Sequence, residues 1–182
     1  MQNYTDDELI ELFGNADKKH YAYNLLVRKH QEKIYYFVRR MVVDHDDADD
    51  VVQNVFIKVW NNLDSFRSDS KFYTWLYRIA VNESLSFLKS KRLRSYLSLS
   101  SPEAMIVKAL HDDVHFDGTE IQKRLREAII RLPQKQQVVF NMRYHDDLSY
   151  NEMSEILGTS VGALKASYHI AAKKIEYFVT SR

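Results

Sequence analysis

The sequence predicts an all-α protein of two small helical domains joined by a flexible linker, with a helix-turn-helix in the C-terminal domain. Three observations lead to this prediction. Apolar residues recur at intervals of three and four, the spacing of a helix with one buried face. Only 4 Gly and 2 Pro occur in 182 residues, which disfavours a β-sandwich. Between residues 95 and 118 the periodicity fades, so we expect a linker there between domains spanning residues 1–94 and 119–182.

The composition narrows the class of protein. The formal net charge is only +1, so any surface for nucleic acid must be local. The absence of Cys excludes disulfides, zinc ribbons and thiol catalysis, and it favours a reducing compartment. No apolar run approaches the roughly 20 residues that span a bilayer, and the first residues do not read as a signal peptide. We therefore expect a cytoplasmic protein with no membrane insertion.

Capping and charge signals place the first helices. Thr5 and Glu8 form a capping box, which predicts a short helix from near Asp6 to Gly14. A second helix is expected over residues 17–29, and a third, separate helix carries the apolar residues between 34 and 42. Five acidic residues in the stretch 44–50 then precede an amphipathic helix, where the helix dipole favours them. A calcium loop is the less favoured interpretation, because the glycine turn and final Glu of an EF-hand are missing.

The segment 66–94 is unusually rich in both aromatic and basic residues, with seven basic residues against two acidic ones. Aromatic rings can stack on unpaired bases while cations follow the phosphates. The segment is therefore either a surface for opened nucleic acid or a core helix with a solvated basic face. A helix is expected over residues 71–91. Its core face would gather Phe72, Leu76, Ile79, Ala80 and Phe87, with Arg78, Asn82 and Lys89 opposite and Ser86 at the edge.

The last third of the chain is helical again. His111 and His115 in the linker have metal-ligand spacing but no third ligand, so no metal site is predicted. Pro133 is expected to open a helix. Ser149 with Glu152 forms another capping box, Gly158 suits the end of that helix, and Ser160 can cap the next. Two helices joined by a tight turn predict a DNA-binding helix-turn-helix, with a plain helical hairpin as the alternative.

Three stretches resemble one family. DADDVVQNVFIKVW (47–60) and FYTWLYRIAVN (72–82) are similar to the region 2 signatures of the extracytoplasmic-function (ECF) sigma factors of bacterial RNA polymerase, and residues 131–166 are similar to region 4. The resemblance implies a sigma factor that binds core RNA polymerase through the β′ clamp helices and the β flap, opens the promoter −10 element and reads the −35 duplex. It also implies an anti-sigma factor as a partner. Enzyme activity is not expected, because the sequence offers no nucleophile–base pair, metal set or phosphate loop, and no cofactor is predicted. The alternative is a stand-alone dimeric helix-turn-helix transcription regulator.

The resemblance and the helical faces together give candidate site residues. The polymerase-binding candidates are Asp49, Asp50, Gln53, Asn54 and Ile57. The −10 candidates are Phe66, Arg67, Lys71, Arg78, Asn82, Ser86 and Lys89. The −35 candidates are Ser160, Ala163, Lys165, Ala166, Ser167, His169 and Lys173.

Two departures from the family pattern and two further expectations accompany these residues. Asn54 stands where the family usually has Glu, and Ser167, Ile170 and Ala172 replace three common arginines, so we expect few charged anchors on −35 DNA. Phe66 is preferred over Trp75 for holding an unstacked base. Self-inhibition would require the two domains to pack together, with the acidic stretch 111–117 lying against the basic stretch 89–94.

Overall fold

The computed structural model describes residues 4–66, 70–97, 110, 113 and 118–181, with the backbone alone described at 95–97. In this part of the chain all regular structure is helical and no strand occurs. The helices are α1 (Asp6–Phe13), α2 (Lys19–Val42), α3 (His45–Asn62), a short 3-10 turn η1 (Leu63–Ser65), α4 (Phe72–Leu97), α6 (Glu120–Ile130), α7 (Gln134–Tyr144), α8 (Tyr150–Leu157) and α9 (Val161–Thr180). The predicted fold class is confirmed.

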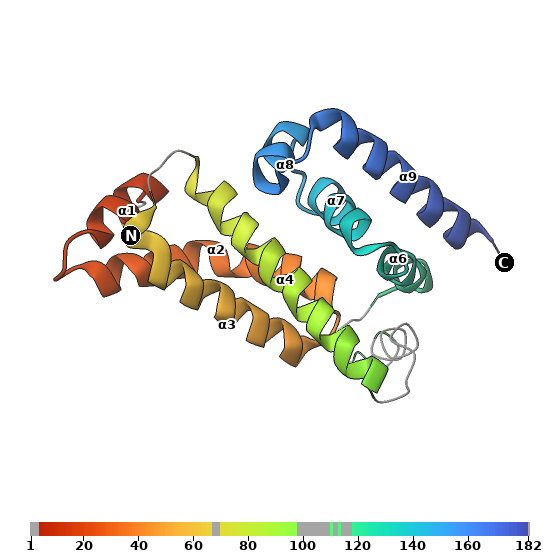
Figure 1. The fold of residues 1–182 in the computed structure, drawn as a ribbon, viewed down its shortest axis with the longest axis horizontal. Helices are drawn as coiled ribbons and strands as arrows, with labels where there is room; N and C mark the ends of the chain where they lie inside the picture. Colours follow the sequence, from red (N-terminus) through yellow and green to blue (C-terminus); the bar gives the residue numbers. More distant parts are fainter. Residues whose placement is uncertain (1–3, 67–69, 98–109, 111–112, 114–117, 182) are drawn as a thin grey trace.

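The helices form two groups that lie against each other (Figure 1). In the first group α2, α3 and α4 pack along their lengths, and α1 closes one end. In the second group α9 packs on α6, α7 and α8. The groups meet where α8 contacts α4 and α7 contacts α2, so α9 lies on the side of the molecule away from α3.

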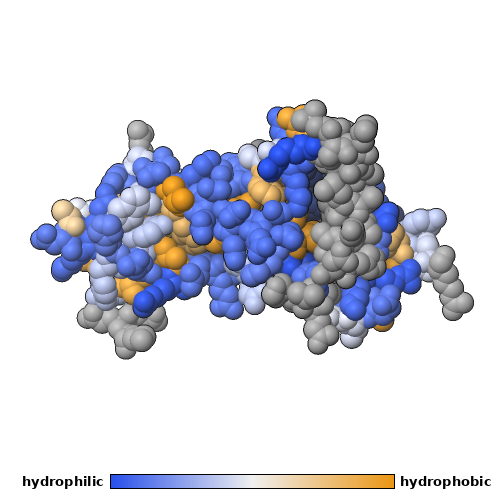
Figure 2. Space-filling view, turned by 90° about the horizontal axis from the view of Figure 1, so that it is seen from below, coloured by the Kyte–Doolittle hydropathy of each residue, from blue (hydrophilic) through white to orange (hydrophobic). Residues whose placement is uncertain are grey.

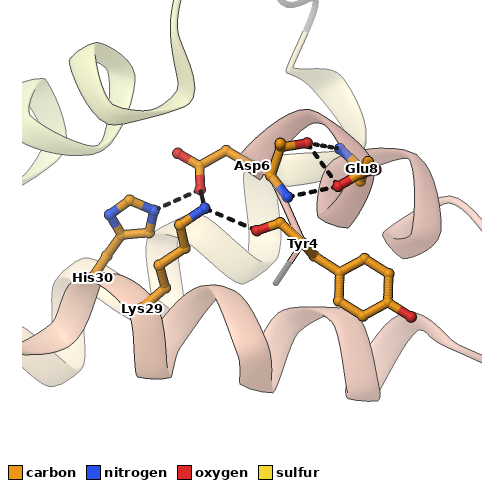
Figure 3. A network of polar contacts seen from close by, with 6 residues as sticks. Tyr4, Asp6, Glu8, Lys29 and His30 are labelled. Atoms are coloured by element: carbon orange, nitrogen blue, oxygen red, sulfur yellow. Dashed lines mark hydrogen bonds and ion pairs between the residues drawn. The ribbon is translucent and has the colours of Figure 1, made fainter. Parts of the chain in front are cut away.

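Helix α1 is fixed by its own cap and by an ion-pair network with α2. The capping box of Thr5 and Glu8 is present as predicted. Asp6 Oδ1 accepts from His30 Nε2 at 2.9 Å and from Lys29 Nζ at 2.8 Å, and the same Lys29 ammonium donates to the Tyr4 carbonyl at 3.1 Å (Figure 3). Because His30 is only 7% exposed, this network ties the start of the chain to a buried position of α2.

Helix α2 is one continuous helix of 24 residues, so the prediction of two helices over residues 17–42 was wrong. His30 is buried, so the buried face of α2 continues without a break from Leu26 through His30 to Ile34. The helix ends at Val42, and its C-cap Val43 has φ 73°, a region that β-branched residues seldom adopt. Asp44 then caps α3 by accepting from the Asp47 amide at 3.0 Å.

Helix α4 is longer and more buried than predicted. It continues to Leu97, six residues past the expected end. Phe72, Leu76 and Ala80 are buried as predicted, whereas Ile79 and Phe87 are only half-buried. A second buried row, with Thr74, Tyr77, Val81 and Ser84, was not predicted. Part of this row faces α2, where the Tyr77 ring lies 5.3 Å from the Phe37 ring.

The helix-turn-helix has the predicted local structure. Ser149 and Glu152 form their capping box, Gly158 ends α8 with φ 62°, and the Ser160 hydroxyl accepts from the Ala163 amide at 3.3 Å. Pro133 differs from its prediction by one position, because it is the N-cap of α7 and not its first residue. A ladder of rings from α7 to α9, Tyr144–Phe140–Tyr168, stacks at 5.1 and 5.5 Å and fixes the two helices side by side.

One apolar core runs through both groups of helices. Buried residues of α7, α8 and α9, including Val138, Met142, Met153 and Ile156, belong to the same cluster as the buried residues of α1 to α4. A second, smaller cluster around Ile129, Phe140 and Ile175 lies within the C-terminal helices alone. The two groups are therefore held together by apolar burial as well as by polar contacts.

Candidate functional surfaces

The five polymerase-binding candidates form one exposed face of α3. Asp49, Asp50, Gln53, Asn54 and Ile57 are all exposed. Their spacing places them on one side of the helix, because Val51, Val55 and Val59 are buried on the other. Ile57 is 54% exposed among these polar residues. Elsewhere too, apolar areas interrupt a mostly hydrophilic surface, as on the face of the molecule in Figure 2. An exposed Ile in a polar face is suited to burial against a partner.

The −10 candidates on α4 form a stripe along one side of the helix. Lys71, Arg78, Asn82, Ser86 and Lys89 are exposed, and their positions differ by whole helical turns. The stripe carries three cations and two small hydrogen-bonding side chains, a combination that suits a nucleic-acid backbone with adjacent base edges. Arg67 lies outside the described residues.

The aromatic residues around the start of α4 pack against one another. The Phe66 ring lies 5.1 Å from the Trp75 ring and 6.1 Å from the Phe72 ring. Phe66 and Trp75 are half-buried and Phe72 is buried. Tyr77 is fully buried at 0% exposure, so it belongs to the core and offers no stacking surface. Phe66 remains the candidate because it lies at the outer end of this ring cluster, on the loop and not on the helix.

One residue of the α4 stripe is already occupied. The Arg78 guanidinium donates to the Glu155 carbonyl oxygen at 2.7 Å and to the Ile156 carbonyl oxygen at 3.3 Å. Both carbonyls belong to the C-terminal end of α8, where a helix leaves its last carbonyls without intrahelical partners and carries partial negative charge. Arg78 therefore caps the first helix of the helix-turn-helix.

The −35 candidates lie on the outer side of α9. Ser160, Ala163, Lys165, Ala166, His169 and Lys173 are exposed, and Ser167 is half-buried. The opposite side of the helix, with Leu164, Ala171 and Ile175, is buried. Ile170, in place of a common family arginine, is 46% exposed. This side of α9 is open in the arrangement of Figure 1.

Two cations flank the aromatic residue that begins α8. Lys165 Nζ lies 5.8 Å from the Tyr150 ring centre and the Arg143 guanidinium lies 5.7 Å from it. Arg143 also pairs with Asp147 at 2.8 Å. Arg143 was not a predicted site residue, because it lies on α7, outside the helix-turn-helix, and only the folded chain brings it beside Lys165.

A buried linker carboxylate bridges the two groups of helices. Asp113 Oδ2 accepts from Arg39 of α2 at 2.5 Å and from Arg126 of α6 at 2.6 Å, and its side chain is 4% exposed. Burial alone would raise the pKa of Asp113, but the hydrogen bonds from Arg126 and Arg39 outweigh it and hold the pKa below 3.8. The carboxylate is therefore charged at neutral pH.

The bridge joins Asp113, one residue of the acidic stretch 111–117, to α2 and α6 and not to the basic stretch 89–94 against which that stretch was expected to lie. Asp113 pairs with α2 and α6, and Lys91 of α4 pairs with Asp47 of α3. The other residues of the stretch 111–117, including both histidines, lie outside the described residues. The bridge faces a cavity of about 570 Å³ between α2 and the helices α6 and α7, whose walls include Tyr36, Leu125 and Tyr144.

A second ion pair crosses between the groups from Arg40 of α2 to Asp146 beyond α7. The Asp146 side chain is 10% exposed, and burial raises its pKa although Arg40 acts to lower it. Two atoms of the pair, Arg40 Nε and Asp146 Oδ2, are buried without a hydrogen-bond partner. The desolvation cost of this pair is therefore only partly offset.

The described residues lack two other kinds of feature. No group of three or more His, Cys, Asp or Glu side chains there is placed to hold a metal ion. In the same part of the chain, no helix has the length and apolar character needed to cross a bilayer.

The comparisons with known proteins agree across the whole chain. The Sigma-70 region 2 family matches residues 26–94, and the Sigma-70 region 4 family matches residues 122–175. The ECF RNA polymerase sigma-E factor of Escherichia coli (strain K12) is 36% identical over 183 residues, which cover 96% of this chain and 94% of that protein. The sigma-E factor of Haemophilus influenzae is 32% identical, with 96% and 95% covered.

Solved structures share the fold at lower sequence identity. CnrH, solved in complex with the cytosolic domain of CnrY, superposes with a TM-score of 0.66 at 20% identity and covers 96% of this chain and 94% of its own. The sigma factor RpoE of Bartonella quintana, solved with the anti-sigma factor NepR, gives 0.64 at 20% identity and covers 87% and 98%.

Proposed function

The chain belongs to the ECF sigma factors of RNA polymerase. From this premise we propose which exposed surface binds the polymerase, which binds the −10 element and which binds the −35 element. As a sigma factor it directs core polymerase to specific promoters and initiates transcription there. The observation that carries the proposal is that the exposed face of α3, the stripe of α4 and the outer side of α9 are separate surfaces. Each is available for a different partner.

The exposed face of α3 is the polymerase-binding surface. Its carboxylates Asp49 and Asp50 supply charge and hydrogen bonds at the rim, and Ile57 supplies an apolar contact among them. Such an arrangement, with a small apolar anchor inside a polar rim, is typical of protein interfaces. We assign it to the clamp helices of the β′ subunit, and we assign the β flap to the C-terminal helices.

The stripe of α4 binds the opened −10 strand. Lys71, Arg78 and Lys89 follow the backbone, while Asn82 and Ser86 supply hydrogen bonds to base edges. Phe66 provides a ring at the end of the stripe. Taking one base out of the stack costs a few kcal/mol, and stacking on an aromatic ring returns about 1–3 kcal/mol, so one well-placed ring offsets much of the cost of holding an unstacked base.

The outer side of α9 binds the −35 duplex. Lys165 and Lys173 contact phosphates, and Ser160, Ala163 and Ser167 lie within the helix face that would enter the major groove. Arg143, beside Lys165, adds a further phosphate contact. The chain itself carries out no covalent step and needs no cofactor, because the polymerase supplies the chemistry. Because the chain acts on DNA, we assign it to the cytoplasm.

An anti-sigma factor is the second protein partner that we propose. The solved RpoE is bound to the anti-sigma factor NepR, and this chain shares that fold. The alternative of a dimeric helix-turn-helix regulator is not favoured, because the likeness to sigma-E includes the N-terminal helices that such a regulator would use for dimerisation.

The experiment that tests the proposal is reconstitution with core RNA polymerase. The full-length chain should bind core at a ratio of one to one and permit run-off transcription from a cognate promoter. The stand-alone regulator would instead bind duplex DNA as a dimer without polymerase. Failure of the full-length chain to bind core enzyme would overturn the proposal.

A further inference from the structure

We propose that the cavity between α2 and the helices α6 and α7 is a binding site for a small aromatic carboxylate. The cavity has a volume of about 570 Å³, which lies within the range of about 300–1,000 Å³ that is usual for small-molecule sites. None of its walls includes a residue assigned above to polymerase or DNA. The site is therefore independent of the proposed function.

Buried polar atoms without partners gather around this cavity. Among the described residues, four buried side-chain nitrogen or oxygen atoms have no hydrogen-bond partner. Three of them belong to residues of the cavity wall: Arg39 Nη1, Arg40 Nε and Asn141 Oδ1. Arg39 is 8% exposed and Asn141 is 0% exposed. Leaving a buried donor or acceptor unpaired costs free energy, so a ligand that supplies the missing partners recovers that cost.

The hydrogen bonds already present show which parts of the wall are left for a ligand. Arg39 donates to Asp113 through Nη2, and its Nη1 is left over. Arg126 also lines the cavity, but it donates to Asp113 at 2.6 Å and we assign it no ligand contact. The Asp113 carboxylate is bonded to both guanidinium groups, which offset its charge. The remaining groups are two N–H donors, on Arg39 and Arg40, and the amide oxygen of Asn141.

The two free donors favour a carboxylate as the charged group of the ligand. Arg39 and Arg40 are consecutive residues of α2, and their guanidinium groups form strong charge-assisted bonds with anionic oxygens. A carboxylate has two acceptor oxygens, one for each donor. A polyphosphate would bring several negative charges close to Asp113 in the same wall, and two donors would not balance them.

The rest of the wall favours a flat apolar body. Tyr36, Leu125, Ile129 and Tyr144 line the cavity. Tyr36 and Tyr144 are each 53% exposed, so their rings are accessible from solvent. The Tyr144 ring stacks on Phe140 at 5.1 Å, which holds it in place without a ligand. Aromatic rings pack well on one another in offset or edge-to-face arrangements, and a wall that is already ordered keeps the entropic cost of binding low.

A hydroxyl on the ligand would complete the match. Asn141 Nδ2 donates to Met41 Sδ at 3.4 Å, which leaves Oδ1 as the acceptor for a ligand O–H. His145, also in the wall, adds no charge at pH 7, because burial and the nearby Arg40 lower its pKa to about 4. The ligand class is therefore an aromatic acid that carries a hydroxyl group.

A ligand in this cavity contacts both groups of helices at once, because α2 belongs to one group and α6 and α7 to the other. A molecule that binds only the folded chain raises its stability as the ligand concentration rises. A small organic acid therefore acts directly on how firmly the two groups are held together.

Isothermal titration calorimetry of the full-length chain with three related probes tests the site. The first probe, 6-hydroxy-2-naphthoate, has one carboxylate, one hydroxyl and a flat apolar body, and we expect one molecule to bind per chain. 2-Naphthol lacks the carboxylate and should bind about tenfold or more weakly, because hydrogen bonds between charged groups are the stronger ones. 2-Naphthoate lacks the hydroxyl and should bind several-fold more weakly. The first probe should also raise the Tm of the chain.

Two variants place the probe in the cavity, each with a matched control. Leu125→Trp fills the space with a larger ring and should abolish binding, whereas Leu93→Trp, the same change at a position of α4 that is 66% exposed, should bind as wild type does. Arg39→Gln should lower the affinity for 6-hydroxy-2-naphthoate about tenfold and leave that for 2-naphthol nearly unchanged. Arg28→Gln, exposed on the same helix, is its control. Circular dichroism identifies any variant that fails to fold.

Three results would overturn the site: no binding of any probe by the wild-type chain, equal affinities for 6-hydroxy-2-naphthoate and 2-naphthol, or wild-type affinity in a folded Leu125→Trp variant. The comparison of the three probes on the wild-type chain decides the matter even where a variant does not fold. No DNA or polymerase is present in these titrations, so their failure leaves the proposed function unchanged, and failure to bind core polymerase leaves the cavity result unchanged.

Discussion

Arg78 and Glu155 are 77 positions apart in the sequence, yet the Arg78 guanidinium donates to the Glu155 carbonyl oxygen at 2.7 Å. This bond joins the stripe proposed to bind the −10 strand to the end of the first helix of the helix-turn-helix. The same donors that cap a helix in the free chain are suited to phosphate oxygens. Arg78 can therefore bind one of two partners at a time, the carbonyls of α8 as in this structure or, under the proposed function, the phosphates of a DNA strand.

Asn82→Ala should weaken promoter opening without affecting polymerase binding. Asn82 is exposed in the centre of the α4 stripe, so its removal leaves the core of the domain intact. The loss of one hydrogen-bonding base contact corresponds to about 1–3 kcal/mol, or roughly tenfold to a hundredfold in open-complex formation. Permanganate footprinting of the −10 region measures it. Asn24→Ala, which removes the same type of side chain from an exposed position on α2, is the control. If Asn82→Ala loses binding to core enzyme, the residue is structural.

Ile57→Ser should weaken binding to core polymerase by about tenfold or more. Ile57 is 54% exposed in the free chain, and burying such a side chain at an interface contributes on the order of 1–2 kcal/mol. The folded chain should keep its stability, because the residue is outside the core. Titration of labelled chain with core enzyme gives the affinity. Gln31→Ser, an exposed change on α2, should have no effect, and equal affinities for the two variants would remove α3 from the interface.

Local signals predicted much of the fold because they depend on neighbours within four residues. The caps at Thr5, Ser149 and Ser160 and the left-handed Gly158 are of this kind. Periodicity failed at His30, where a polar residue type takes a buried position because the Asp6 carboxylate of another helix accepts a hydrogen bond from it. The single long α2 was missed for that reason.

The contacts between the two groups could not be predicted from the sequence. Arg39 and Asp113 are 74 positions apart, and Arg40 and Asp146 are 106 apart. No spacing rule links such residues, since their proximity depends on how α7 and α8 dock on α2 and α4. The burial of Tyr77 has the same origin, because its ring packs on Phe37 of α2, which lies 40 positions away in the sequence. The exposed stripes of α3, α4 and α9 were predictable because each lies on one helix.

Binding of the full-length chain to −35 duplex should have a shallow dependence on salt. The outer side of α9 offers Lys165 and Lys173, with His169 between them, and Arg143 nearby. Three neutralised phosphates give a slope of about −3 in a plot of log affinity against log salt concentration. Fluorescence anisotropy from low to moderate salt measures it, and Lys165→Ala should reduce the slope by about one. A slope steeper than about −6 would mean that other cations contact the DNA.

Asp6→Asn should destabilise the N-terminal helices by about 1–2 kcal/mol, the cost of weakening a part-buried charged network. Burial would raise the pKa of Asp6, but Lys29 and His30 lower it below 3.8. The carboxylate therefore contributes stability above pH 3.8, and this contribution is lost as pH falls through the lower folded-state pKa. Urea unfolding at pH 7 and pH 3 measures the difference, which should shrink at pH 3. Asp7→Asn, exposed in the same helical turn, should cost only a few tenths of a kcal/mol.

Replacing Arg40 and replacing Asp146 should change the stability of the folded chain by different amounts. Burial raises the pKa of Asp146 above 3.8, so the folded chain holds a proton there more tightly than the unfolded chain does. The wild type therefore loses stability as pH rises from 3.8 through the folded-state pKa, and Asp146→Asn removes that loss. At pH 7 we expect Asp146→Asn to be neutral or stabilising, whereas Arg40→Met leaves a buried carboxylate unpaired and should cost about 3 kcal/mol.

Urea unfolding of the two single variants and the double variant between pH 4 and pH 8 tests this asymmetry. The double variant should recover most of the stability lost in Arg40→Met, because the uncompensated charge is gone. The gap between Asp146→Asn and wild type should widen as pH rises and then become constant. Equal destabilisation by the two single changes at pH 7 would mean that the attraction between Arg40 and Asp146 exceeds the cost of burying the carboxylate, and the sign of the pH dependence would then reverse.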